Sequence, residues 1–339
     1  MRMRFLATAM VLISTLLLPG GVASAVPATC DEVDVAVTTL TTPATMHGTL
    51  CLPDGPTPDT VMLLVPGATY NSTYWDFPYH PATYSYRLAM NAAGYATFAV
   101  DRLGTGKSTK PLSALVTATT QAQAVHQVVQ SLRSGAGIGT SFGKVVLTGH
   151  SLGSAIAVLE AATYRDVDAL VVTGMQHKLN AVNLALLFST DLVPAPLDPA
   201  LASRGLDAGY LTTVQGRRYA AFHAPGVVEP AVIAADEATK DVFSSIEAPD
   251  AVGVAILSPY SASIDVPVFI AMGAADGLFC GFLVTTCTRS GVLTAERPYY
   301  SAAPSVDAFV LPTAGHDINL SPRAPEVHEA VITWTNATL

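Results

Sequence analysis

The segment Gly149-His150-Ser151-Leu152-Gly153 constrains the fold of this chain more than any other feature. An apolar run, Val145–Thr148, precedes it, and a helix-forming stretch, Ala155–Ala162, follows it. A strand that turns sharply into a helix at a G-x-S-x-G segment holds the serine hydroxyl clear of the sheet, and glycine tolerates the crowding and dihedral angles of such a turn. The first N–H groups of the helix point at the same place and favour negative charge there. We therefore interpret Ser151 as a nucleophile rather than as part of an ordinary Gly-Ser turn.

The N-terminus has the order of a secretory signal peptide. The basic residues Arg2 and Arg4 are followed by an apolar stretch, Phe5–Leu18, and by the small residues Ala23-Ser24-Ala25. The apolar stretch is shorter than the roughly 20 residues of a membrane span. We expect residues 1–25 to be a signal peptide and residues 26–339 to form a secreted, extracellular domain without a stable membrane anchor; an uncleaved N-terminal anchor is the alternative.

Four cysteines remain after the signal peptide. An even number in an oxidising compartment indicates two disulfides, and four cysteines allow three pairings. We favour Cys30 with Cys51 and Cys280 with Cys287, because each pair is close in sequence. A zinc site is the competing interpretation, but no C-x-x-C pair or nearby histidine has the spacing of zinc ligands.

The composition favours one large globular domain. Hydrophobic residues make up 50% of the chain and charged residues only 13%, which supports a well-buried core. The net charge is −9, and loss of Arg2 and Arg4 with the signal peptide would make it more negative. Nucleic acid is therefore not expected as a partner. The oligomeric state stays open.

Short apolar runs alternate with helix-like segments from Asp34 onward, a pattern typical of an α/β sheet. Strands are expected at Val35–Leu40, Met46–Leu52, Thr60–Val65, Tyr95–Val100, Val145–Thr148, Ala169–Thr173, Val266–Met272 and Ala308–Leu311. Helices are expected at Tyr84–Ala93, Ser113–Arg133, Gly153–Thr163 and Ala324–Asn336. These elements predict a mostly parallel central sheet of about eight strands with helices on both faces.

The stretch of about 90 residues between Thr173 and Val266 is far longer than an ordinary α/β connection. Val182–Leu187 and Val232–Phe243 are expected to be helical, and prolines around Pro194 break the pattern between them. We interpret residues 177–262 as a lid inserted above the sheet, without a core of its own. Its apolar side chains, among them Leu184, Leu187 and Phe188, would either close a pocket or attach the lid.

A serine hydroxyl is a weak nucleophile at neutral pH, so it needs a neighbouring base and a group that orients the base. The chain resembles the α/β-hydrolase superfamily over essentially all of residues 26–339. The strongest motif of this resemblance is the segment Gly149–Gly153. In that superfamily, the catalytic residues follow the order Ser, Asp or Glu, His. Of the eight histidines, only His316 follows the last expected strand and precedes the last helix, where the superfamily places its base. His150 is the variable residue of the elbow, and His126 and His328 fall inside expected helices.

Asp276 is the best candidate for the acid. It lies in a glycine-rich loop after the strand Val266–Met272, and functional groups of open α/β sheets gather at the carboxyl ends of strands. Its role would be to fix the tautomer of the imidazole and to stabilise the imidazolium. There are two alternatives. Asp191, near the start of the insertion, could be the acid, or Asp276 could have a purely structural role in its glycine-rich loop.

Two backbone N–H groups are expected to form an oxyanion hole, the first from Leu152, which follows the nucleophile. The segment Leu64-Val65-Pro66-Gly67-Ala68 resembles the H-G-x loop of the superfamily, which implies Ala68 as the second donor. Because Pro66 stands where the family has histidine, Thr69 and Tyr70 remain alternatives to Ala68.

The segment Asp101–Ser108 ends in Gly-Lys-Ser, as a phosphate-binding loop does, but Asp101 stands where such a loop needs glycine. It resembles instead the D-x-R-G-x-G-x-S turn of many α/β-hydrolases, and we interpret it as structural. The segment Tyr70–Tyr79 concentrates aromatic residues. These rings would either line an apolar pocket or anchor the loop to the sheet.

The sequence therefore predicts a serine hydrolase that cleaves carboxylic esters or lactones through an acyl-enzyme. No metal or organic cofactor is expected, and a small-molecule substrate is the expected partner. A serine at the elbow argues against the epoxide hydrolases and haloalkane dehalogenases, which use a carboxylate there. Amide cleavage and acyl transfer use the same residues and remain alternatives, as does a non-catalytic binding protein on the same scaffold.

Overall fold

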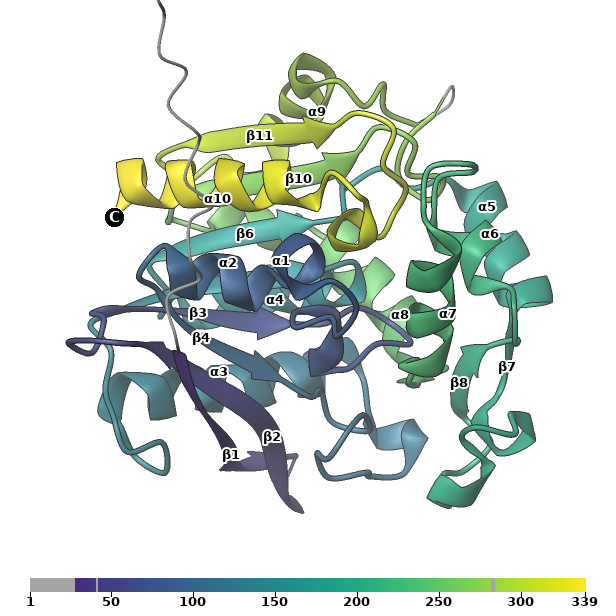
Figure 1. The fold of residues 1–339 in the computed structure, drawn as a ribbon, viewed down its shortest axis with the longest axis horizontal. Helices are drawn as coiled ribbons and strands as arrows, with labels where there is room; N and C mark the ends of the chain where they lie inside the picture. The colour runs from purple at the N-terminus through teal and green to yellow at the C-terminus, as the bar shows by residue number, and fades with distance from the viewer. Residues whose placement is uncertain (1–27, 41, 282–283) are drawn as a thin grey trace, which may run out of the picture.

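The computed structural model describes residues 28–40, 42–281 and 284–339, so the expected signal peptide lies outside the described residues. Eight strands form one sheet in the order β1-β2-β4-β3-β5-β6-β10-β11 (Figure 1). β1 and β2 form an antiparallel hairpin that joins β4 antiparallel, and all the other pairs are parallel. The predicted fold class is confirmed. The strands are β1 (Ala28–Thr39), β2 (Thr42–Pro53), β3 (Thr60–Val65), β4 (Ala96–Val100), β5 (Lys144–His150), β6 (Ala169–Thr173), β10 (Val268–Gly273) and β11 (Val306–Leu311).

Helices cover both faces of this sheet. On one face α2 (Tyr86–Ala92) packs against α10 (Ala324–Thr338), and on the other α3 (Ala118–Ser134) packs against α4 (Leu152–Tyr164) (Figure 1). With both faces covered, the central parallel strands are apolar and buried along nearly their whole length. Two further helices are α1 (Pro81–Tyr84) and α9 (Arg289–Glu296); α9 was not expected from the sequence.

Side-chain caps explain where the observed helices differ from the expected ones. The helix expected over Ser113–Arg133 is a short 3₁₀ turn, Ser113–Leu115, followed by α3, because Thr117 caps α3 in a reciprocal pair with Thr120. The helix expected over Tyr84–Ala93 corresponds to α2 and begins two residues later, because Ser85 caps α2 and its hydroxyl accepts a hydrogen bond from the Leu88 N–H group.

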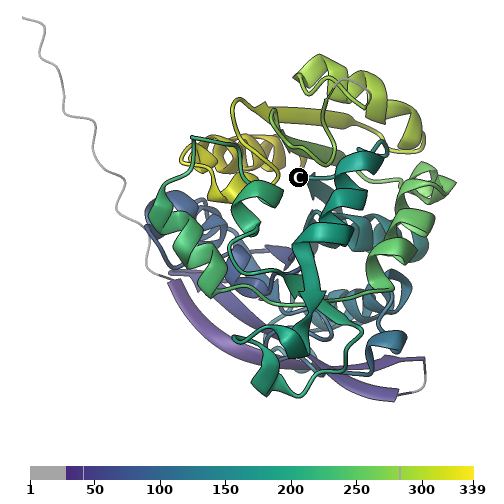
Figure 2. The same ribbon diagram turned by 90° about the vertical axis from the view of Figure 1, so that its right-hand side faces the viewer.

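The insertion between β6 and β10 lies beyond the carboxyl ends of the parallel strands (Figures 1 and 2). Its apolar residues, including Phe222, Val232 and Phe243, join the same core cluster as the sheet. A second, small buried cluster joins Val116 to four residues of the insertion, Ala195, Leu201, Tyr210 and Val242. The elements of the insertion are α5 (Ala181–Leu186), a π-helical turn (Leu187–Asp191), β7 (Leu192–Pro194), β8 (Tyr210–Thr213), α6 (Arg218–Phe222), α7 (Pro230–Ala238), β9 (Phe243–Ser244), α8 (Glu247–Ala251) and a second π-helical turn (Val252–Ile256).

The insertion also contains a small antiparallel sheet, β7-β8-β9, that the sequence did not reveal. The helix expected over Val232–Phe243 is wrong at its C-terminal end, because α7 stops at Ala238 and Phe243 pairs with Leu211 in this sheet. Strands of two to four residues are too short to show an alternating pattern.

Both expected disulfides are present in the structure, Cys30–Cys51 and Cys280–Cys287. Cys30 and Cys51 are directly opposite each other in the β1–β2 hairpin, and the second bond closes the loop after Asp276. Among the residues that the structure describes, no helix combines the length and apolar character needed to cross a membrane.

Candidate active site

Ser151 occupies the turn between β5 and α4 with a strained backbone, at φ 51° and ψ −118°. Its N–H group donates to the Thr173 carbonyl, with 2.8 Å between nitrogen and oxygen. The flanking glycines leave no room for side chains: a Cβ on Gly149 would lie 2.4 Å from the Gly153 oxygen, and one on Gly153 would lie 2.3 Å from the Val65 oxygen. The turn is therefore possible only with glycine on both sides of Ser151.

The structure brings Ser151, His316 and Asp276 into one hydrogen-bonded row. The Nε2 atom of His316 lies 2.8 Å from the Ser151 hydroxyl oxygen, and its Nδ1 atom lies 2.9 Å from an Asp276 carboxylate oxygen. His316 follows β11 and Asp276 follows β10, so loops at neighbouring strand ends supply both. With a proton on Nδ1, the imidazole can accept the serine proton on Nε2.

The loop after β10 holds the Asp276 carboxylate in place. One of its oxygens accepts hydrogen bonds from the N–H groups of Leu278 (2.8 Å) and Phe279 (3.2 Å), which leaves the other for His316. The alternative acid, Asp191, instead pairs with Arg217 at 2.6 Å. The structure therefore places Asp276, and not Asp191, beside the histidine.

The environment of His316 raises its pKa above the ordinary value of 6.5. Burial disfavours the imidazolium and opposes this shift, but the negative charge and hydrogen bond of Asp276 outweigh it, with a further contribution from Asp317. The histidine is thus a stronger base than a free imidazole, which suits a group that must take a proton from serine.

Backbone N–H groups that could bind an anion lie close to Ser151. Among the described residues, Ala68 and Leu152 make no backbone hydrogen bond through their N–H groups, whereas the Tyr70 N–H donates to the Gly67 carbonyl at 3.3 Å. A Cβ on Gly67 would lie 3.2 Å from Cβ of Ser151, so this turn packs directly against the elbow. This geometry favours Ala68 over Tyr70 as the second donor; the N–H of Thr69 is also unengaged.

His150 does not touch Ser151 through a hydrogen bond. Its Nε2 atom lies 3.2 Å from an Asp317 oxygen, and its ring stacks on Tyr74 with 4.4 Å between centroids. Burial is the main cause of its lowered pKa. His150 is therefore a buried structural group, as its place in the elbow suggested.

A buried polar cluster that the sequence did not reveal lies behind this row. It joins Asp317 and Tyr70 to three residues of the insertion, Arg218, His223 and Asp236. Its members are widely separated in the chain, and the only local signal is the position of Asp317 next to His316. The ligand atoms of His223, Asp236 and Asp317 in this cluster lie close enough together to hold a metal ion. The same is true of a second group, formed by His126, Glu160 and Asp166. Hydrogen bonds link the first cluster internally, and burial raises the pKa of Glu160 well above its ordinary value, which favours a neutral carboxyl in the second.

The carboxylate of Asp101 binds backbone N–H groups of its own turn and of the segment that contains Ser72. The carboxylate of Asp101 accepts hydrogen bonds from the Ser72 N–H (2.9 Å) and the Lys107 N–H (2.8 Å). A Cβ on Gly106 would lie only 1.9 Å from this carboxylate. The Asp101 carboxylate thus has a structural role in this turn.

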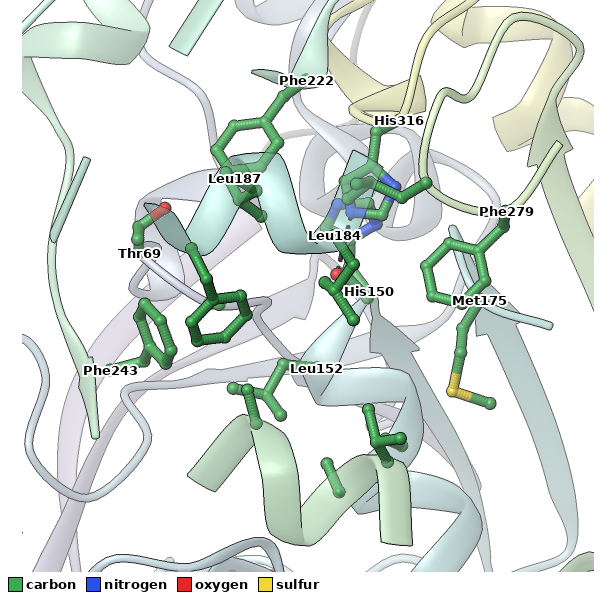
Figure 3. Close-up of a pocket in the computed structure, with 18 of the residues that line it drawn as sticks. Thr69, His150, Leu152, Met175, Leu184, Leu187, Phe222, Phe243, Phe279 and His316 are labelled. Atoms are coloured by element: carbon green, nitrogen blue, oxygen red, sulfur yellow. Dashed lines mark hydrogen bonds between the residues drawn. The ribbon is translucent and has the colours of Figure 1, made fainter. Parts of the chain in front are cut away.

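A pocket of about 710 Å³, including its open mouth, leads to Ser151 and His316 (Figure 3). Apolar side chains of the insertion form much of its wall, among them Leu184, Leu187, Phe188, Phe243 and Val252. None of the described lining residues is Asp, Glu, Lys or Arg.

The aromatic loop contributes little to this pocket. Tyr70 lines it, whereas Tyr74, Trp75 and Phe77 are buried away from it in the core. Of the two interpretations of the loop, the structure therefore favours anchoring for these three rings.

Comparisons with known proteins show the family and the fold of this chain. The model of the alpha/beta hydrolase family matches residues 62–329. No curated protein matches. Among solved structures, E-2-(acetamidomethylene)succinate hydrolase is similar with a TM-score of 0.55 and 19% identity, over 90% of this chain and 100% of that one. A thermophilic esterase from Thermogutta terrifontis is similar with a TM-score of 0.53 and 17% identity, over 90% and 98%.

A third similar structure is the enol-lactonase from Burkholderia xenovorans LB400, with a TM-score of 0.55 and 16% identity, over 86% of this chain and 97% of that one. At such low identity, these likenesses show a shared fold. The family model covers well over half of the chain and includes Ser151, Asp276 and His316. The chain therefore belongs to the alpha/beta hydrolase family.

Proposed function

We propose that the protein is a serine hydrolase that cleaves uncharged carboxylic esters or lactones. The observation that carries this proposal is the hydrogen-bonded row Ser151–His316–Asp276 at the base of an apolar pocket. Nucleophile, base and orienting acid are in contact before any substrate binds. A purely structural role would not require the strained backbone of Ser151, which holds the hydroxyl toward the base.

In the proposed reaction, the Ser151 oxygen attacks the substrate carbonyl while His316 takes the serine proton. The N–H groups of Ala68 and Leu152 stabilise the negative oxygen of the tetrahedral intermediate. Collapse of the intermediate breaks the ester bond, and His316 returns the proton to the leaving alcohol. Water then attacks the acyl-enzyme, with His316 again as base, and releases the acid and free serine. Asp276 stabilises the imidazolium in both steps without taking its proton.

The apolar wall of the pocket predicts strong discrimination against charged acyl groups. Without a cation in the wall, a buried carboxylate would lose its hydration without a partner, at a cost of several kcal/mol. We expect kcat/KM for p-nitrophenyl monosuccinate to be at least about 100-fold below that for the pentanoate ester of similar length. Steady-state kinetics on the two esters measures this ratio. Equal values would place the acyl group in solvent rather than in this pocket.

The raised pKa of His316 predicts the acid side of the pH profile. Only the neutral imidazole can accept the serine proton, so activity is present above this pKa and is lost as the pH falls through it. We expect kcat/KM for a neutral ester to fall with an apparent pKa above 6.5, the ordinary value of histidine. A profile that stays flat through this range would contradict the assignment of His316 as the base.

Hydrolysis of p-nitrophenyl esters of graded acyl length, compared with aminoacyl anilides and with acyl transfer to added alcohols, tests the proposed bond type. The proposal predicts ester turnover that depends on acyl length. Turnover of anilides alone would show an amidase, and absence of all turnover by folded protein would favour a binding protein on this scaffold.

We further propose that the protein is secreted after removal of residues 1–25. The support is the signal-like N-terminal sequence together with two disulfides, which form and persist in oxidising compartments. N-terminal sequencing of protein from the culture medium of the source organism tests this.

A further inference from the structure

The turn that carries Ala68 contains a residue in an unfavourable conformation. Thr69 has φ +62°, in the left-handed region that a β-branched side chain rarely adopts. Such a conformation persists only where the surroundings hold it, and it costs free energy that those contacts must offset. Thr69 is buried, with 1% of its surface exposed. The groups that contact it therefore determine the shape of the turn.

Two groups of the insertion hold Thr69. The N–H of Asp241 donates to the Thr69 carbonyl at 2.8 Å. The guanidinium of Arg218 donates from Nη1 to the Thr69 hydroxyl oxygen at 2.9 Å. Both the main chain and the side chain of this residue are thus bound from the insertion.

Arg218 is itself rigidly placed. It is fully buried, and its Nη2 atom donates to a carboxylate oxygen of Asp236 at 2.8 Å. The other oxygen of Asp236 lies 2.9 Å from Nε2 of His223. The guanidinium also lies over the ring of Tyr70, 4.3 Å from its centroid. A charge held by this many partners is well suited to fix a neighbouring loop.

The other end of the turn is held from the sheet side. Arg102, also fully buried, donates from Nη2 to the Gly67 carbonyl at 3.1 Å. In a trans peptide, the carbonyl of one residue and the N–H of the next point in opposite directions. A fixed Gly67 carbonyl therefore fixes the direction of the Ala68 N–H, and Thr69 controls the peptide on the other side of Ala68.

We propose that Arg218 is a positioning residue for the oxyanion turn, which it holds through Thr69 and Tyr70 so that the Ala68 N–H meets the oxyanion of the tetrahedral intermediate. This inference rests on the proposed serine hydrolase function. It gives the insertion a part in catalysis beyond forming the pocket wall. Because the donor acts on charge that develops only in the transition state, its misplacement lowers kcat more than it raises KM.

Thr69→Val is the sharpest test, because it removes the hydroxyl acceptor, keeps the β-branched shape and leaves Arg218 paired with Asp236. We expect kcat to fall about 10- to 100-fold and KM to change little, since misplacing a catalytic group by about 1 Å can cost 10²-fold. Affinity for a trifluoromethyl ketone, which forms an oxyanion on the serine, should fall by a similar factor. Thr69→Ser keeps the acceptor and should recover most of the lost kcat.

Arg218→Met should give the same kinetic pattern if it folds, and Arg217→Met is its matched control. Arg217 is adjacent in sequence and pairs with Asp191; among the described residues, its side chain forms no hydrogen bond or ion pair with the turn. The proposal is overturned if Thr69→Val keeps the parental kcat, if Thr69→Ser loses as much as Thr69→Val, or if the loss lies only in KM. Failure of the proposed function is distinguishable, because the parent itself would then neither hydrolyse esters nor react with a serine-directed phosphonate.

Discussion

Replacing Ser151 by alanine is expected to lower kcat for p-nitrophenyl ester hydrolysis by about 10⁶-fold, with little change in KM. The variant loses the attacking oxygen, while the pocket that binds the acyl group stays intact. Thermal stability should change little, because in the described part of the chain the hydroxyl of Ser151 forms a hydrogen bond with His316 alone and the strained backbone remains the same. Steady-state kinetics with a calorimetric melting scan measures both quantities.

Ser154→Ala is the matched control for Ser151→Ala. Ser154 lies one turn further along α4 and is fully buried, and its hydroxyl exchanges hydrogen bonds with the backbone of Thr173. Its removal should lower the melting temperature and leave the chemical step in place. A Ser151→Ala variant with undiminished ester turnover would contradict the assignment of the nucleophile.

Asp276→Asn is expected to lower kcat by about 10⁴-fold. The asparagine amide can donate to Nδ1 of His316, which places the imidazole proton on Nε2 and prevents that atom from accepting the serine proton. Loss of the carboxylate charge also removes the main cause of the raised pKa of His316, so the acid limb of the residual activity should move to lower pH.

Asp191→Asn separates the two acids that the sequence offers. Asp191 pairs with Arg217 on the insertion, so this variant should keep a kcat near that of the parent. A larger loss in Asp191→Asn than in Asp276→Asn would contradict the proposed role of Asp276.

The residues of the central row could be predicted from sequence because each follows a strand in the parallel part of the sheet. Ser151 stands between a strand and a helix in a glycine-flanked turn, and His316 and Asp276 follow the last two strands. Parallel strands bring their carboxyl ends to one edge, so the strand pattern, together with the chain order of the superfamily that the elbow resembles, places the three residues near each other. The positions of these three residues can therefore be predicted without knowing how the insertion folds.

The groups around the row could not be found in this way. Arg218 lies 149 residues from Thr69 along the chain, and no periodic pattern links the two. The insertion folds as short strands and helices whose positions depend on contacts with the main sheet rather than on local propensity. The choice between Ala68 and Tyr70 likewise required the structure, because the Tyr70 N–H is used by the turn itself.

The central claim is that the Ser151 hydroxyl is the nucleophile, and reaction with a fluorophosphonate tests it most directly. Intact-mass spectrometry followed by peptide mapping should show one adduct per chain, on the peptide that contains Ser151, with ester hydrolysis lost in proportion to labelling. Asp276→Asn should label more slowly, and Ser151→Ala should not label. Full ester hydrolysis by protein that remains unlabelled, or an adduct on another residue that abolishes activity, would contradict the account.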